Sequence, residues 1–509
     1  MNTLDSLQRR HWLGAALATG LAPAFLRHAW AADQPRFAQG VASGFPRPDG
    51  MVLWTRLTGP DLPERVEVQW EVAHDERFSQ MVAKGTCTAE AAWAHSVHAE
   101  PAGLAPDRWY FYRFRALGDQ SSVGRTRSTP APDAVRPLRF VIASCQRYDA
   151  GHFAAWRQAV TDAPDLVVFL GDYIYEYASR ADALRRHEGG AAVTLDQYRA
   201  RYATYQSDPL LQAAHAACPW VSIWDDHEVE NDYAGLQSQT LDPAFRFRRS
   251  AAYQAHWEHL PYPQALRPDR GEARIHGTLD WGALARLIRL DGRQFRDPQV
   301  CPKPGRGGSN TLTRQACPAF DEPGRSLLGR PQEQWLANAW DDRRPWNLLA
   351  QPTLMSPFSW TDPGAPEGGT WWTDGWDGYA PARQRLLDDL AARRVANAVV
   401  LGGDVHTHYV SQLHRVARDP ASPILASEFC GSSITSPSLP QSRVAGALPF
   451  NPHVLYGRAD QRGTISFVLT PQRLEATLTA VDNLADPASP VRVAARYVVE
   501  AGKPGPVAA

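Results

Sequence analysis

Four apolar stretches of the sequence each end in residues whose side chains can bind metal ions. The groups that follow them are "SC" at 144–145, "GDYIY" at 171–175, "DDHE" at 225–228 and "GGDVH" at 402–406. Short apolar runs bounded by turn residues predict buried strands, and loops beyond the carboxyl ends of such strands converge in α/β sheets. The acids, thiol, phenol and imidazoles could therefore enclose two metal ions.

Each group taken alone also has an ordinary structural explanation. An aspartate after a strand commonly caps a helix or closes a turn. A single cysteine is commonly a small buried residue. All four groups, however, stand just past a predicted strand in one chain. This repetition favours a shared metal site over four unrelated turns.

The stretches that carry these groups predict a layered α/β domain over residues 139–495, with a mixed sheet. The run "LRFVIASC", the segment "HFAAWRQAVTD" and the run "DLVVFLGD" have the pattern of a strand, a helix and a strand. Near the C-terminus, "GTISFVLTPQRLEATLTAVD" predicts an antiparallel hairpin. We expect residues 496–509 to form a tail that either caps the site or hangs free.

The first part of the chain follows a different pattern. From residue 37 to about residue 130, short β-rich runs alternate with turn residues, which predicts a small all-β sandwich domain over residues 32–130. The segment "LAPDRWYFYRFRA" resembles the corner of fibronectin type III-like domains, where a tyrosine fixes the loop. Residues 131–138, at the end of the Pro-rich "STPAPDAVRP", are interpreted as a linker.

The N-terminus has the features of an export signal. Arg9 and Arg10 precede a short apolar run, and Ala29 and Ala31 fit a small-x-small cleavage site. We expect residues 1–31 to be removed after Ala31, leaving a periplasmic or secreted chain. The arginine pair resembles signals read by the twin-arginine export machinery; an ordinary secretory signal with a chance pair is the alternative. No later stretch is long and apolar enough for a membrane helix.

Composition and cysteines add two constraints. The 509 residues carry a formal net charge of -1 with 44% hydrophobic residues, so charge gives no reason to expect a nucleic-acid-binding patch. Cys301 and Cys317 bracket a Gly/Pro-rich loop and could form a disulfide in an exported protein. This loop and the aromatic segment "WWTDGWDGYAPARQRLL" could frame the entrance to the site.

The motif set as a whole resembles a known family. "SC", "GDYIYE", "WDDHEVENDY", "LDGRQFRD" and "GGDVHTH", in this order behind "GVASGFPRPDGMVLWTRL", are similar to the PhoD-like alkaline phosphatases. That family has a calcineurin-like metallophosphoesterase core and is related to the purple acid phosphatases. The resemblance implies a secreted, metal-dependent hydrolase of phosphomonoesters, phosphodiesters or both.

The resemblance also implies a ligand set. Asp172 would bridge two metals, and Tyr175 would bind a ferric iron together with Cys145 and His406. Asp226 and Asp404 would hold a second metal. Hard cations prefer oxygen ligands, so these carboxylates favour calcium over zinc, with one or two calcium ions.

Asp226 and two neighbours of these ligands, His227 and Arg293, are candidates for catalysis. His227, beside Asp226, would protonate the leaving group or hydrogen-bond the phosphate. Glu228 is interpreted as an orienting or capping residue. Arg293 has a geometry suited to phosphate oxygens, although a salt bridge to Asp291 or Asp297 is equally consistent with the sequence.

One further residue and two other functions remain open. Asn231 could contact the second metal or the phosphate. The same metal site could serve a phospholipase D-like enzyme or a phosphodiesterase of a wall polymer such as teichoic acid. A non-catalytic surface protein that binds sugar or protein is the third interpretation.

Overall fold

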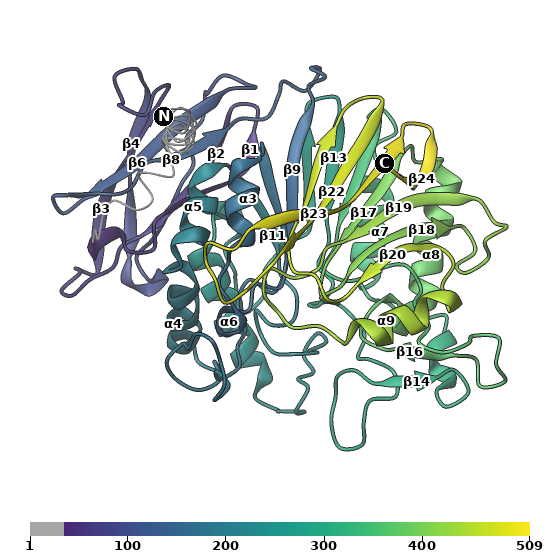
Figure 1. Ribbon diagram of the computed structural model, residues 1–509. Helices are drawn as coiled ribbons and strands as arrows, with labels where there is room; N and C mark the ends of the chain where they lie inside the picture. The colour runs from purple at the N-terminus through teal and green to yellow at the C-terminus, as the bar shows by residue number, and fades with distance from the viewer. Residues whose placement is uncertain (1–34) are drawn as a thin grey trace, which may run out of the picture.

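The computed structural model of the protein describes residues 35–509 (Figure 1). The predicted signal peptide, with Arg9, Arg10 and the cleavage site after Ala31, lies outside the described residues. Within residues 35–509, no helix is sufficiently long and apolar to cross a membrane.

Two large sheets form the centre of the molecule. The first sheet has ten strands, and the second sheet has seven. In order across the first sheet the strands are β24 (Lys503–Ala508), β23 (Val491–Glu500), β22 (Arg473–Val481), β21 (Ile465–Leu469), β9 (Leu138–Ala143), β10 (Leu166–Leu170), β11 (Trp220–Ile223), β1 (Val41–Arg47), β2 (Gly50–Arg56) and β5 (Ser96–Ala99). In the second they are β12 (Gly277–Trp281), β13 (Ala285–Arg289), β15 (Trp346–Ala350), β17 (Ala398–Gly402), β19 (Ile424–Cys430), β18 (His408–His414) and β20 (Val454–Arg458).

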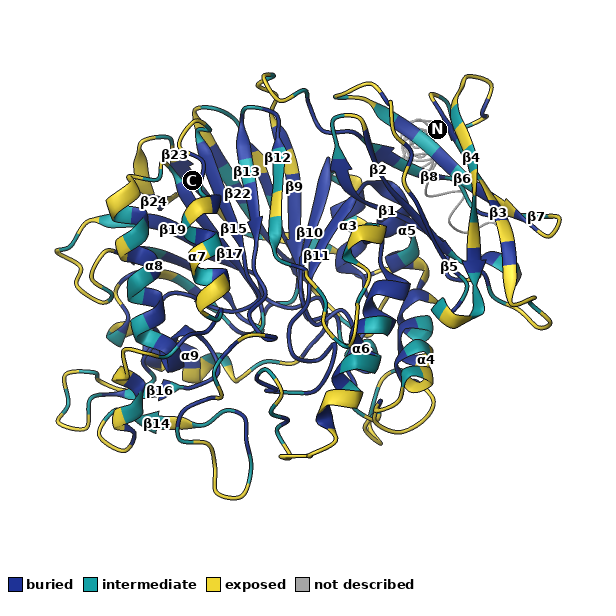
Figure 2. Cartoon of the chain, turned by 180° about the vertical axis from the view of Figure 1, so that it is seen from behind, coloured by how far each residue is buried: buried dark blue, intermediate teal, exposed yellow. Residues whose placement is uncertain are grey.

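The two sheets pack face to face. Phe140 and Val168 of the first sheet lie against Leu287 and Leu348 of the second, and all four side chains are buried in one core cluster. The central strands β9, β10 and β11 are parallel, whereas β21 is antiparallel to β9. The predicted mixed sheet is therefore confirmed, and the strands appear as the buried centre in Figure 2.

Helices cover the outer faces of both sheets. Trp156 of α3 packs on Trp220 of β11, with ring centroids 4.8 Å apart. Leu336 and Leu387 pack with Val400 of β17 on the second sheet. The helices are α3 (Ala155–Thr161), α4 (Leu195–Gln206), α5 (Pro209–Ala217) and α6 (Phe245–His259) on the side of the first sheet, and α7 (Arg330–Ala339) and α8 (Ala380–Arg393) on the side of the second.

The N-terminal strands form the expected sandwich, but one of its sheets continues into the α/β domain. Val68 and Tyr112 of the separate five-stranded sheet pack against Leu53 of β2. β1 in turn pairs with β11 at Gly44, where an added Cβ would lie 2.7 Å from the Trp220 carbonyl oxygen. The five-stranded sheet contains β3 (Arg65–Ala73), β4 (Met81–Glu90), β6 (Trp109–Ala116), β7 (Asp119–Gln120) and β8 (Gly124–Arg127).

The tyrosine corner is present in this sandwich. The Tyr110 hydroxyl accepts a hydrogen bond from the Ala105 amide at 2.9 Å and donates one to the Ala105 carbonyl at 3.1 Å. Both bonds hold the loop that precedes β6. The segment interpreted as a linker, 131–138, contains no strand before Leu138 opens β9.

The C-terminal residues require a correction. The hairpin predicted near the C-terminus is present as β21 and β22. The predicted tail 496–509, however, neither caps the site nor hangs free, because β23 runs through its start and β24 occupies most of the rest. The Gly505 amide of β24 donates to the Ser427 hydroxyl of β19 at 3.1 Å, so the chain end joins the two sheets. The strands β23 and β24 are the yellow ribbons of Figure 1.

A small two-stranded ribbon stands beyond the second sheet. It pairs β14 (Thr311–Thr313) with β16 (Thr370–Trp372). The predicted disulfide between Cys301 and Cys317 is confirmed, with a Cα–Cα distance of 6.1 Å. β14 lies inside the loop that this disulfide closes.

Candidate metal centre

The predicted ligand groups come together where the two sheets meet. Cys145 and Asp172 follow β9 and β10 of the first sheet, and Asp404 and His406 follow β17 of the second. All four residues have positive φ angles, between 52° and 63°. Non-glycine residues adopt this region at an energetic cost, and residues that do so are found at turns and cluster at functional sites.

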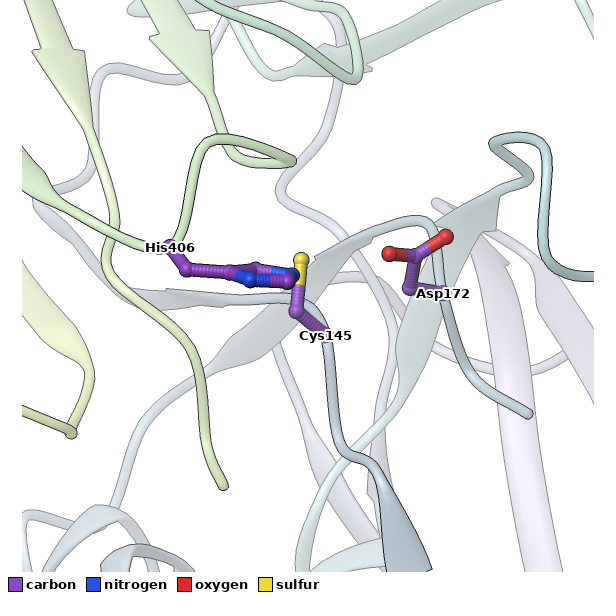
Figure 3. A group of neighbouring side chains, drawn as sticks. All are labelled: Cys145, Asp172 and His406. Carbon is purple, nitrogen blue, oxygen red and sulfur yellow. The ribbon is translucent and has the colours of Figure 1, made fainter. Parts of the chain in front are cut away.

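The first ligand group is the one that the resemblance assigned to iron. Single ligand atoms of Cys145, Asp172 and His406 all lie within 4.8 Å of one another. The Tyr175 hydroxyl oxygen lies 2.8 Å from Asp172 Oδ2 and 3.1 Å from His406 Nε2. Figure 3 shows the His406 ring directed toward the Cys145 sulfur, with the Asp172 carboxylate on the other side.

The imidazole of His406 is set up to offer a lone pair to this group. Its Nδ1 lies 2.7 Å from the Pro437 carbonyl oxygen, which can only accept a hydrogen bond, so Nδ1 carries the proton. Burial lowers the pKa of His406 to about 3, so the ring is neutral. Such an outer hydrogen bond is typical of metal-binding histidines, because it fixes the tautomer and the orientation of the ring.

The second ligand group consists of Asp172, Asp226 and His227, whose ligand atoms again lie within 4.8 Å of one another. Buried oxygens around it lack hydrogen-bond partners: Oδ1 of Asp172, Oδ2 of Asp225, Oδ1 of Asp226 and Oδ2 of Asp404. Buried carboxylate oxygens without partners are costly unless a cation balances them. These four carboxylate oxygens therefore fit a hard, oxygen-binding cation.

The electrostatics of the acids agree with this fit. Burial, reinforced by neighbouring carboxylates, raises the pKa of Asp172 and of Asp404 well above the usual range. Burial also raises the pKa of Tyr175 and Cys145. A bound cation favours the charged form of each such group.

Arg293 does not lie where a phosphate contact requires it, and this prediction is corrected. Its side chain is 2% exposed, with Nε 2.5 Å from Asp225 Oδ1 and Nη2 2.8 Å from Asp374 Oδ2. Arg293 does form buried salt bridges, but not with the expected partners. Its contact with Asp291 is made by the Arg293 backbone amide, which donates to Asp291 Oδ1 at 3.0 Å. Burial alone would raise the pKa of Asp226, but Arg293 and His227 lower it.

Replacing Arg293 tests this structural role. We expect Arg293→Met to lower the free energy of unfolding by about 3 to 5 kcal/mol, because Asp225 would remain buried without a cation and Asp374 would keep only Arg296. The control is Arg458→Met, which breaks an exposed pair with Asp460 and should cost at most about 1 kcal/mol. Urea unfolding measures the change in the free energy of unfolding for both variants. Equal costs for the two variants would contradict the buried network.

Two buried glutamates hold the residues around the site in place by hydrogen bonds. Glu228, expected to orient or cap, accepts hydrogen bonds from the backbone amides of Tyr173, Asp172 and Asp225 at 2.6, 3.1 and 2.8 Å. It thereby holds the loops after β10 and β11 together. Glu176 was not predicted: its Oε2 lies 2.7 Å from His227 Nδ1. Its position directly after the "GDYIY" group was the only available signal.

The ligand groups open into a cavity of about 520 Å³. Asp172, Asp226, Asp404 and His406 line it, and so do His227 and Asn231. Burial alone would lower the pKa of His227, but the carboxylates of Asp226 and Glu176 raise it well above its usual range. The cavity therefore presents acids and imidazoles together at one end.

The fold and the site define a class. Two facing sheets with metal-binding residues after their strands are the architecture of metallophosphoesterases. A solved purple acid phosphatase from yellow lupin seeds shares this fold, with a TM-score of 0.54 at 12% identity, covering 90% of this chain and 74% of that one.

Closer relatives identify the family. The family model for the PhoD-like phosphatase matches residues 140–478, and that for its N-terminal domain matches residues 20–130. The chain is 38% identical over 488 residues to alkaline phosphatase D of Bacillus subtilis (strain 168), covering 92% of this chain and 82% of that protein. A solved structure of PhoD has a TM-score of 0.86 at 36% identity, covering 94% of this chain and 92% of that one.

The chain belongs to the PhoD-like phosphatase family. It is a hydrolase of phosphoric esters and, like its relatives, metal-dependent. The predicted family and enzyme class are confirmed, and a non-catalytic binding protein is excluded as its main function.

Proposed function

We propose that the protein is an exported phosphatase that uses a ferric iron and calcium to hydrolyse phosphomonoesters, phosphodiesters or both. One observation carries this proposal: Cys145, Tyr175 and His406 surround Asp172, although they come from three separate loops. A thiolate, a phenolate, a carboxylate and an imidazole form the donor set that the family resemblance assigns to ferric iron.

Calcium is proposed for the second position. Asp226 and Asp404 offer only carboxylate oxygens, and each has a buried oxygen without a hydrogen-bond partner. Hard cations such as calcium bind several oxygen ligands in flexible geometry. Asn231 lines the same cavity and could supply another oxygen, which leaves room for one or two calcium ions.

The chain's own groups position the reacting ester. Bound cations would neutralise phosphate charge and lower the pKa of a water molecule. Glu176 holds Nδ1 of His227, which leaves Nε2 available to protonate the leaving oxygen or to hydrogen-bond the phosphate. The Asp232 amide donates to Asp226 Oδ2 at 2.6 Å, which fixes the carboxylate and leaves Oδ1 without a hydrogen-bond partner.

Export through the twin-arginine machinery, with cleavage after Ala31 and a periplasmic or secreted product, is part of the proposal. The pair Arg9 and Arg10 before an apolar run supports it. The disulfide between Cys301 and Cys317 also supports it, because disulfides persist mainly in oxidising compartments.

Metal analysis tests the proposal. Protein collected after export by its native route should contain iron and calcium, with about one iron and one or two calcium ions per chain if the assignment holds. A calcium chelator should abolish release of nitrophenol from p-nitrophenyl phosphate and from bis(p-nitrophenyl) phosphate, and added calcium should restore it. Comparing these esters also separates a monoesterase from a diesterase of phospholipids or wall polymers. Zinc in place of iron and calcium would overturn the assignment.

A further inference from the structure

The cavity that holds the ligand groups has an aromatic wall. The rings of Tyr409 and Phe358 lie 5.1 Å apart, and those of Phe358 and Trp360 lie 4.9 Å apart in an edge-on arrangement. Tyr409 and Phe358 are buried, whereas Trp360 is half-buried, and all three line the cavity. The row therefore runs from the floor of the cavity toward solvent.

This wall begins beside the ligand groups. Val405 stands between Asp404 and His406 in the chain, is half-buried, and lines the cavity. It packs against the cluster that contains Phe358 and Tyr409. An alcohol group attached to a phosphate at the acidic end would therefore meet apolar surface immediately.

The ribbon of β14 and β16 adds a further aromatic residue to the cavity. Trp371 is buried in a cluster with Cys317 and Phe320. Successive residues of a strand point to opposite faces, and the next residue, Trp372, lines the cavity. Trp372 pairs with Thr311 of β14, so the loop closed by the Cys301 to Cys317 disulfide supports this side of the cavity.

The charge of the cavity argues against a polyanionic substrate. Among its lining residues in the described part of the chain, Arg443 is the single lysine or arginine. Its guanidinium carbon lies 4.8 Å from the centre of the Trp360 ring, so its charge is partly engaged there. The cavity thus offers apolar area and no cluster of cations that would bind further phosphates.

We propose that the preferred substrates are phosphate esters of an apolar alcohol, aromatic or long-chain alkyl, and that Trp360, with Phe358 and Val405, determines this preference. The inference rests on the proposed phosphatase function and specifies its substrate class. Each apolar group buried against the wall would stabilise the bound ester, because removing apolar surface from water is favourable.

Three esters with alkyl leaving groups test the preference: 2-phenylethyl, n-octyl and glycerol 3-phosphate, each as the monoester and as its methyl diester. We expect the wild type to prefer the first two. Trp360→Ala should lower kcat/KM for both by about 10-fold and change that for the glycerol ester less than about twofold. Trp360→Leu should restore kcat/KM for the octyl ester alone if the natural alcohol is a long alkyl chain. If the natural alcohol is aromatic, Trp360→Leu should restore kcat/KM for neither ester.

Two leucines provide a matched control that leaves the core intact. Leu439 lines the cavity and Leu455 does not, although each is 40% exposed. Leu439→Ala should lower kcat/KM for the apolar esters by about threefold, and Leu455→Ala should leave it unchanged. Two results would overturn this inference but not the proposed function. One is an active wild type that hydrolyses the three esters equally well, and the other is an equal loss of kcat/KM on all three esters in both the Trp360 and the Leu439 variants. Absence of phosphate release from every ester would overturn the proposed function with it.

Discussion

Asp172→Asn is expected to lower kcat/KM by at least about 1000-fold, equivalent to about 4 kcal/mol of transition-state stabilisation. Asp172 belongs to both ligand groups, so the loss of its charge weakens both proposed metal positions at once. Asparagine tolerates the φ of 58° at this position, which makes it a better replacement than alanine for separating charge from backbone strain. Metal content and phosphatase activity are both measured.

A carboxylate of the cavity that lies outside both ligand groups serves as the control. Asp377 also lines it, but its Oδ1 accepts from Arg383 and its Oδ2 from the Phe358 amide, at 2.7 and 2.9 Å. Asp377→Asn should therefore keep the metal content of the wild type. Full iron and calcium in the folded Asp172→Asn protein would contradict the bridging role. Thermal unfolding of both variants shows whether a loss of metal reflects a loss of fold.

Strand ends were predictable from the sequence because two local patterns coincide there. An apolar run identifies a buried strand, and a turn with acids after it identifies the position of the ligand. The structure brings Cys145, Asp172, Tyr175 and His406 together as those patterns predicted. The carboxyl ends of the parallel neighbours β9 and β10 lie at one edge of the first sheet, so the approach of Cys145 and Asp172 follows from topology. His406 follows β17 of the second sheet, so its approach also depends on how the two sheets pack.

The partners of buried charges could not be predicted in this way. Arg293 reaches Asp374, which is 81 residues further along the chain, and no local pattern connects the two. Glu176 contacts His227 across 51 residues for the same reason. Such pairs depend on how loops from different strands fold over one another, and a one-dimensional pattern does not contain that information.

The C-terminal strands illustrate a different limit. The last residues, "YVVEAGKPGPVAA", combine apolar residues with glycine and prolines, which are uncommon inside a sheet. β24 nevertheless forms, because it is an edge strand at the end of the first sheet. Proline is tolerated at an edge, where no second partner needs its missing amide proton. The local sequence is therefore typical of an unstructured tail, although these residues pair with β23 as the edge strand of the sheet.

Tyr175→Phe is expected to remove the phenolate charge-transfer band from the visible absorption of the iron-loaded protein and to lower its iron affinity by at least about 10-fold, because loss of a proposed ligand should cost no less than loss of a supporting contact. The variant deletes one oxygen, the one that lies 2.8 Å from Asp172 Oδ2 and 3.1 Å from His406 Nε2. A phenolate bound to ferric iron transfers charge to it on absorbing visible light, so the band reports the bond directly. Absorption spectroscopy and metal analysis measure the two effects.

Tyr173→Phe is the matched control. It deletes the same atom from a buried tyrosine two residues earlier, whose hydroxyl lies 2.8 Å from His215 Nε2 instead. Losing that hydrogen bond should cost about 1 kcal/mol of stability while colour and iron content stay unchanged. An unchanged visible band in Tyr175→Phe would show that the phenol is not a ligand. Of the two hydroxyl groups, that of Tyr175 contacts the ligand residues and that of Tyr173 contacts His215. Equal loss of iron in both variants would therefore show that the hydroxyl groups affect iron binding by stabilising the fold.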